Sequence, residues 1–290
     1  RHAESKAKNR AIRQALGASG LENLRLVHDA LPELDLDQVS LRSHALGGSV
    51  DTPFFIAAMT AGHPDAVDLN RRFALACARR GWALGVGSQR RDLEEIAAGR
   101  ARGGLDGWAD LRAEFPALRL YANIGVSQLI PAAAENVRRL VQDMSATALV
   151  VHANALQESL QPEGTPRFKG GVEALRRVVA SVGVPVILKE TGCGFSEHTL
   201  LRLRDAGLAA VDVSGLGGTH WGRIEGARAG AAWQGRAAQV FRDWGIPTVD
   251  AVLNSARVFA GGRTETWASG GVRTGLDAVK LLALGASQVG

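Results

Sequence analysis

Short apolar runs recur along the whole chain, and polar or glycine residues follow them. Apolar strands that alternate with helical patterns are typical of repeated βα units, in which helices cover a parallel sheet. We expect eight such strands, at Phe54–Met59, Trp82–Gly87, Leu120–Ala122, Ala148–Val151, Val184–Leu188, Ala209–Val213, Thr266–Ala268 and Ala286–Val289.

Apolar residues at helical spacing fill the intervals between these strands. The predicted helices are Ala66–Arg80, Pro131–Asp143, Gly171–Val182, Glu197–Ala206 and Gly275–Leu284, with a further helix near Ala237–Trp244 in the longest interval. This alternation predicts an α/β fold, a single (β/α)8 TIM barrel. The active site of such a barrel lies at the C-terminal ends of its strands, where the polar residues stand here.

The region before the barrel has a different character. Residues 1–20 predict a basic helix with Ala11, Ile12, Ala15 and Leu16 as its apolar stripe, and residues 21–51 predict an irregular segment with a short hairpin around Leu41–Val50. We therefore expect an N-terminal extension over residues 1–52 and a barrel over residues 53–290. The sequence ends with the eighth strand, so the eighth loop and helix are absent from it.

Composition narrows the classes of function. The 290 residues suit one barrel of about 250 residues. No apolar run reaches the length of a membrane span, the charged N-terminus is unlike a secretory signal, and two cysteines fit a reducing compartment, so we expect a cytoplasmic protein. The net charge of +5 comes without a basic patch interleaved with aromatic residues, which argues against nucleic acid and suits anionic small molecules.

Two glycine-rich turns follow the sixth and seventh predicted strands. Gly217, Gly218 and Thr219 form the first, and Gly270–Gly275, which includes Arg273, forms the second. Glycine lets backbone N–H groups approach a phosphate closely, and the start of the following helix favours an anion. The neighbouring turns therefore predict a phosphate-bearing ligand.

Lys189 ends the fifth predicted strand. An ammonium emerging from an apolar strand needs an anion beside it. A flavin ring, which is anionic near N1 when reduced, is one candidate, and an internal ion pair with Glu190 or Asp212 is another. A Schiff-base lysine remains a third interpretation.

Polar side chains also follow the second, third and fourth strands. His152 and Asn154 project in the same direction, with Gln157 and Glu158 just beyond. Glu158 is a candidate Mg²⁺ ligand, since Mg²⁺ prefers one or two carboxylates together with substrate phosphates. The neutral groups of Ser88, Gln89 and Asn123 are suited to the edge of a planar heterocycle, with Ala58, Met59 and Thr60 as a shelf for the ring.

Taken together, these segments resemble the type 2 isopentenyl-diphosphate isomerase family, whose members depend on FMN. The resemblance covers nearly the whole chain. It rests on Val27–Glu33, Ala58–Thr60, Gly85–Arg90, Ala122–Gly125, His152–Glu158, Gln161–Gly164, Pro185–Glu190, Asp212–Gly215, Gly217–Thr219 and Ala268–Thr274.

The resemblance implies that the protein interconverts isopentenyl and dimethylallyl diphosphate by adding and removing a proton, in isoprenoid biosynthesis. Reduced FMN is required, NADPH supplies the electrons, and the barrel assembles as a tetramer or octamer. Lys189 would poise the flavin, Gln157 and His152 would assist at the alkene, and Glu158 would bind Mg²⁺. FMN would contact Ala58, Met59, Thr60, Ser88, Asn123, Lys189, Ser214, Thr219, Gly271, Val272 and Arg273, and the diphosphate substrate Lys8, Ser88, Gln89, Arg90, Asn154 and Gln157.

The chain departs from the family pattern near its start. The family's Arg-Lys pair, and the His that follows it after two intervening residues, correspond to Ala7, Lys8 and Ala11, so only Lys8 survives. His220, after Thr219, is a milder departure to which we assign no role. The alternatives are another FMN-dependent barrel oxidoreductase, such as a hydroxy-acid oxidase, and a catalytically impaired homologue that binds a phosphate ligand.

Overall fold

A computed structural model describes residues 19–61, 64–100, 107–228 and 230–290. The helix predicted over residues 1–20 lies almost wholly outside the described residues, and so does Lys8. Within the described residues, no helix is long and apolar enough to cross a membrane.

Eight parallel strands form one sheet whose order follows the chain, from β3 to β10. A bridge between Phe54 and Val289 joins the first strand to the last, so the sheet closes into a barrel. The predicted (β/α)8 architecture is confirmed. The strands are β3 (Phe55–Ile56), β4 (Ala83–Gly85), β5 (Arg119–Gly125), β6 (Ala148–Ala153), β7 (Val186–Glu190), β8 (Ala210–Asp212), β9 (Glu265–Ala268) and β10 (Gln288–Val289).

The strands β5, β6 and β7 continue, at their C-terminal ends, beyond the apolar runs from which they were predicted. Asn123, His152 and Lys189 lie inside β5, β6 and β7, because the sheet pairing continues past the apolar residues: Gly125 pairs with His152, and His152 with Lys189. Polar side chains are therefore held on rigid backbone at the C-terminal end of the barrel.

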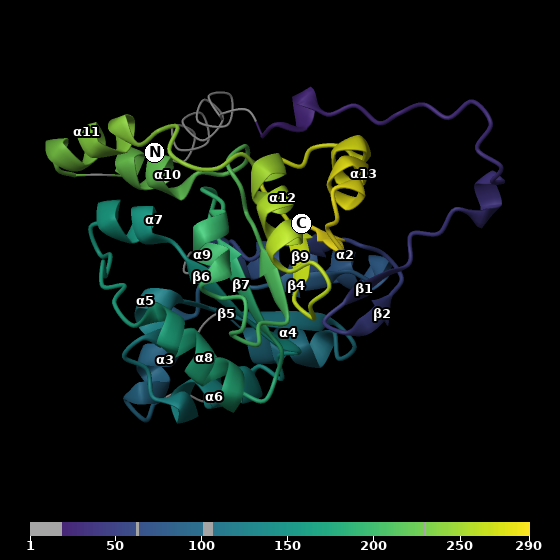
Figure 1. The fold of residues 1–290 in the computed structure, drawn as a ribbon. Helices are drawn as coiled ribbons and strands as arrows, with labels where there is room; N and C mark the ends of the chain where they lie inside the picture. The colour runs from purple at the N-terminus through teal and green to yellow at the C-terminus, as the bar shows by residue number, and fades with distance from the viewer. Residues whose placement is uncertain (1–18, 62–63, 101–106, 229) are drawn as a thin grey trace.

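Helices cover the outside of the barrel (Figure 1). The five helices predicted between strands are present, although α9 is shorter than expected. They are α2 (Pro64–Arg80), α6 (Ala134–Asp143), α8 (Gly171–Ser181), α9 (Glu197–Leu201) and α13 (Gly275–Ala283). Four further helices were not expected from the sequence, namely α3 (Arg90–Ala97), α4 (Trp108–Glu114), α5 (Val126–Leu129) and α7 (Ala155–Leu160).

The long interval between β8 and β9 holds three helices rather than the one predicted near Ala237–Trp244. These are α10 (Trp221–Arg228), α11 (Ala232–Val240) and α12 (Thr248–Val258). The predicted helix overlaps only the end of α11, because Phe241–Trp244 turn away from it. Leu216 pairs with Pro247 in an isolated bridge, which brings the two ends of the α10–α11 excursion together.

The hairpin expected around Leu41–Val50 is present as β1 (Ser43–Ala45) and β2 (Gly48–Val50). Its Ala45 and Val50 side chains pack with Tyr121 and Trp267 from the barrel interior. The hairpin thereby closes the N-terminal end of the barrel and leaves its other end as the accessible mouth.

Between this hairpin and the segment around Leu21, the extension bows away from the barrel (Figure 1). It contains two short 3-10 helices, η1 (Leu21–Asn23) and η2 (Leu36–Gln38), and every residue from 25 to 42 is exposed. Its first end is fixed near the mouth, where Val249 N–H donates to the Ser19 carbonyl and Lys280 Nζ to the Leu21 carbonyl.

Trp267 provides a test of the interior packing. Its ring lies 5.0 Å from that of Phe55 and 5.8 Å from that of Tyr121, and Nε1–H donates to Glu265. We expect Trp267→Ala to lower the free energy of unfolding by about 3–5 kcal/mol, because it leaves a cavity in a packed core. Chemical denaturation measures the effect. The exposed Trp233 is the matched control, and an equal loss in Trp233→Ala would contradict this account of the core.

Candidate functional site

A cavity of about 650 Å³ opens at the C-terminal mouth of the barrel. Its volume lies within the range of about 300–1,000 Å³ typical of small-molecule sites. Residues that follow β3, β7, β8 and β9 line it. The predicted cofactor residues among them are Ala58, Met59, Thr60, Lys189, Ser214, Thr219, Gly271, Val272 and Arg273.

The two glycine turns lie against each other in the wall of this cavity. A side chain on Gly218 would place its Cβ 2.5 Å from the Gly271 nitrogen, and one on Gly271 would place it 2.6 Å from the Gly217 oxygen. Gly271 also has a φ of +85°, which favours glycine. Arg273 Nη2 donates to the Gly217 carbonyl across the same contact. The turns therefore form one cradle of partly exposed backbone with a cation at its edge, which suits a phosphate.

Lys189 lines the cavity and forms a buried ion pair. Its Nζ lies 3.0 Å from Asp212 Oδ2 and donates to the Glu190 carbonyl. Ser269 Oγ donates to the other oxygen of Asp212 at 2.6 Å. The sequence offered Glu190 and Asp212 as partners for an internal ion pair, and the Asp212 carboxylate is the one that pairs with the ammonium.

The Glu190 carboxylate points elsewhere. Its Oε2 accepts from the backbone N–H groups of Thr191, Cys193 and Gly194, which fixes the loop after β7. Burial raises the pKa of Glu190 to about 7 in spite of these donors.

A hydrogen-bond network fixes the protonation of His152. Asn123 Nδ2 donates to the Val86 carbonyl, so its Oδ1 is the acceptor for His152 Nδ1–H at 2.9 Å. Gln89 Oε1 accepts from the Asn123 backbone and holds that residue in place. Burial, with a further contribution from Lys189, lowers the pKa of His152 to about 4. The imidazole is therefore neutral at pH 7, with its lone pair on Nε2.

A second polar cluster lies at the start of α7. Asn154 Nδ2 donates to Gln157 Oε1 at 3.0 Å and to Glu158 Oε1 at 3.3 Å, while the Thr165 N–H donates to Glu158 Oε2. Asn154 Oδ1 is buried and has no hydrogen-bond partner among the described residues. The Asn154 amide and the Glu158 carboxylate are thus in contact, and amide and carboxylate oxygens are both ligand types that Mg²⁺ accepts.

Glu225, on α10, belongs to the same cluster and was not predicted. Its carboxylate is fully buried, Gln157 Nε2 lies 3.5 Å from Oε1, and Arg228 pairs with Oε2 at 2.7 Å. Burial raises the pKa of Glu225. Glu225 is the only acidic residue within α10. This single acidic position was the one feature of the sequence that could have indicated Glu225 as a site residue.

The remaining predicted residues are less closely gathered. Ser88 is exposed, and neither it nor Asn123 lines the main cavity. Gln89 is buried, and its side-chain amide already hydrogen-bonds to the Asn123 backbone and the Asp92 carboxylate. Arg90 binds Glu94 and the Glu163 carbonyl and lines a separate cavity of about 400 Å³. Among the described residues, no group of three or more His, Cys, Asp or Glu side chains could hold a metal ion.

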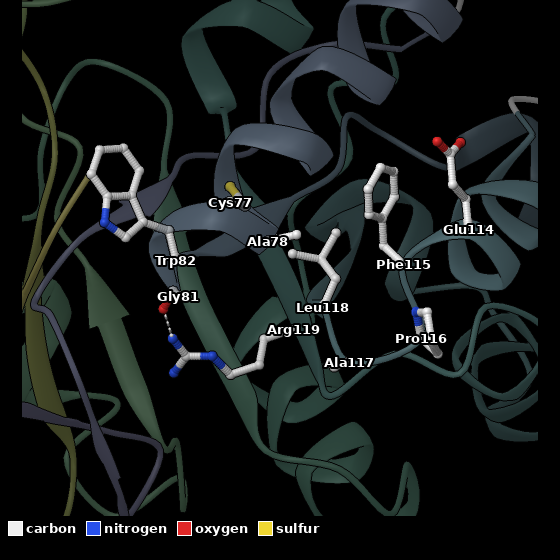
Figure 2. Close-up of a pocket in the computed structure, with 10 residues that line it drawn as sticks. All are labelled: Cys77, Ala78, Gly81, Trp82, Glu114, Phe115, Pro116, Ala117, Leu118 and Arg119. Atoms are coloured by element: carbon white, nitrogen blue, oxygen red, sulfur yellow. Dashed lines mark hydrogen bonds between the residues drawn. The ribbon is translucent and has the colours of Figure 1, made fainter.

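A third cavity, of about 280 Å³, lies near the N-terminal end of β5 (Figure 2). Arg119 Nη2 donates to the Gly81 carbonyl at its edge. The Cys77 thiol faces it from α2, but burial raises the pKa of Cys77 to about 12, so the thiol is not a nucleophile at pH 7.

The whole chain resembles known proteins. Residues 4–290 match the model of a family described as FMN-dependent dehydrogenase. A protein named isopentenyl-diphosphate delta-isomerase from Legionella pneumophila (strain Corby) is 49% identical over 93% of this chain and 77% of its own length. Proteins of the same name are 47% identical in Bdellovibrio bacteriovorus, over 96% and 79% of the two chains, and 40% identical in Methanosarcina acetivorans, over 94% and 73%.

Solved structures show the same fold at low identity. A mandelate oxidase variant with an FMN monooxide adduct matches 96% of this chain and 76% of its own, with a TM-score of 0.61 and 17% identity. A second variant, with 2-hydroxy-phenylacetamide, gives a TM-score of 0.56 at 20% identity, over 93% and 72%.

The buried ion pair yields a prediction about stability. Asp212→Asn leaves the Lys189 ammonium without its counter-charge, so we expect the free energy of unfolding to fall by about 3–5 kcal/mol. Denaturant titration at pH 7 measures it. The exposed pair of Glu197 with Arg257 is the control, and Glu197→Gln should cost less than about 1 kcal/mol. Equal losses in the two variants would show that the buried ion pair contributes no more to stability than the exposed one.

Proposed function

We propose that this chain, which belongs to the FMN-dependent dehydrogenase family, is an isopentenyl-diphosphate delta-isomerase that works with FMN. The observation that carries the proposal is the cavity at the barrel mouth, where a glycine cradle and a buried lysine occur together. The relatives that share 40–49% of its residues bear that name.

The cavity fits FMN in its chemistry. The cradle of Gly218 and Gly271, with Arg273 beside it, would hold the phosphate, and the shelf of Ala58 and Met59 would meet the ring. When bound in its reduced state, FMN would supply the proton-transfer chemistry of the double-bond shift. The barrel part of the chain, residues 53–290, would hold the cofactor.

Lys189 would hold positive charge beside the ring. Asp212 fixes the direction of the ammonium, and the low exposure of both side chains strengthens any charge interaction within the cavity. An anionic ring is thereby favoured over a neutral one.

The cluster at α7 would receive the diphosphate and the alkene. Gln157 lies between Asn154 and Glu225, so its amide is oriented from both sides. His152 is neutral and would accept a hydrogen bond at Nε2. These groups would orient the five-carbon substrate, and the walls of the barrel would exclude water.

Mg²⁺ would bind at Glu158, whose carboxylate contacts the Asn154 side chain, with the substrate phosphates as the remaining ligands. NADPH is the proposed reductant. The proposed assembly is a tetramer or octamer. A cytoplasmic location fits the free thiols of Cys77 and Cys193.

A turnover experiment tests the proposal. The purified protein is loaded with FMN and given isopentenyl diphosphate, NADPH and Mg²⁺ without oxygen. We expect dimethylallyl diphosphate to form, and oxidised FMN to abolish the reaction. Oxygen consumption with a 2-hydroxy acid would instead support the oxidase alternative. A yellow, flavin-bound protein that turns over neither substrate would indicate the impaired homologue.

The metal proposal has its own prediction. Glu158→Gln removes the carboxylate charge, so we expect the Mg²⁺ concentration for half-maximal activity to rise by about tenfold or more. The flavin absorbance should stay unchanged. Glu173→Gln, at an exposed position on α8, is the matched control. A wild-type Mg²⁺ titration in Glu158→Gln would remove Glu158 from the metal site.

A further inference from the structure

His220 lies at the N-terminal end of α10 and is almost completely buried. Its two chain neighbours, Thr219 and Trp221, both line the cavity at the barrel mouth. The residue therefore sits between two parts of the cavity wall without lining the cavity itself.

The contacts of His220 fix its tautomer. Nδ1 accepts a hydrogen bond from the Arg223 N–H at 3.2 Å, and Nε2–H donates to the Trp244 carbonyl at 3.0 Å. The His220 carbonyl also accepts from the Arg223 and Ile224 N–H groups, as the residue before a helix does. The side chain thus caps the first turn of α10, the place usually taken by Ser, Thr, Asp or Asn.

A nucleophilic role for the neighbouring thiol does not fit the geometry. Cys193 Sγ lies 3.5 Å from His220 Nε2, but that nitrogen carries the proton donated to Trp244. Burial raises the pKa of Cys193 to about 12, so the thiol keeps its own proton. The pair is a packing contact between the loop after β7 and α10.

The helix that His220 caps carries Glu225 to Gln157. Glu225 lies five residues beyond the cap, and Arg228 holds its other oxygen. A shift of the first turn of α10 would move Trp221 in the cavity wall and the Glu225 carboxylate together. The Trp244 contact also fixes α10 to the chain that returns after α11.

We propose that His220 is a positioning residue, which in its neutral form caps α10 and thereby sets Glu225 against Gln157 and the substrate. This inference rests on the proposed isomerase function for its catalytic readout, while its capping role is testable without turnover.

The cap depends on a neutral ring, because a protonated Nδ1 would donate and could no longer accept from Arg223. Burial lowers the pKa of His220 below its ordinary 6.5. The capping contribution is therefore complete above pH 6.5 and is lost as pH falls through the lowered pKa. The charged and titratable groups that face the ring are Arg223 on α10, Asp243 after α11, and Cys193 after β7.

Three variants test the role. His220→Asn keeps a side-chain acceptor at the cap, His220→Leu removes it, and His198→Ala changes an exposed histidine on α9 as the control. With FMN bound, we expect His220→Leu to lower kcat about tenfold with KM changed less than about twofold, and His220→Asn to recover most of the loss. In a Glu225→Gln background, His220→Leu should have little further effect, because both act on one interaction.

Unfolding measured from pH 8 to pH 5 supplies the readout without turnover. We expect the wild type to lose more stability toward pH 5 than His220→Asn, whose cap does not titrate. The proposal would be overturned, even in an active isomerase, if His220→Asn and His220→Leu lowered kcat equally. It would also be overturned if the kcat losses of His220→Leu and Glu225→Gln multiplied in the double variant. Identical pH profiles for the wild type and His220→Asn would overturn the cap, whatever the substrate proves to be.

Discussion

The ion pair of Lys189 and Asp212 is the interaction on which the site depends. Two opposite charges are buried side by side on adjacent strands, and the pairing of β7 with β8 sets their separation. Ser269, which directly follows β9, donates to the carboxylate, so residues at three neighbouring strand ends contribute to one charge arrangement. An ammonium held in this way cannot retreat to solvent. Its charge borders the cavity, where it would attract the proposed anionic ring.

Hydrogen bonds hold the uncharged side chains of the site in place in a similar way. Gln89 fixes Asn123, Asn123 fixes His152, and the imidazole is left with one defined lone pair. The residues predicted to touch ligand thus divide into two groups in the described structure. Some line the cavity, and others, such as Gln89, hold a neighbouring side chain in place.

The barrel and most of the cavity could be predicted because they depend on patterns that are local in the sequence. An apolar run such as Val184–Leu188 favours a buried strand wherever it occurs, and the residue after it must emerge at the mouth. Three kinds of feature were beyond this reasoning. The α10–α11 excursion has a weak apolar stripe, so its helix bounds were wrong. Glu225 joins the site only through tertiary packing. The sequence allowed several partners for Lys189, so Asp212 could not be singled out.

The contact between the two glycine turns has a consequence for how the cavity can change. Because Gly218 and Gly271 touch backbone to backbone, neither turn can move or gain a side chain without displacing the other. The two loops are therefore one mechanical unit although more than fifty positions separate them. A change in the shape of this part of the cavity wall therefore requires both turns to move together.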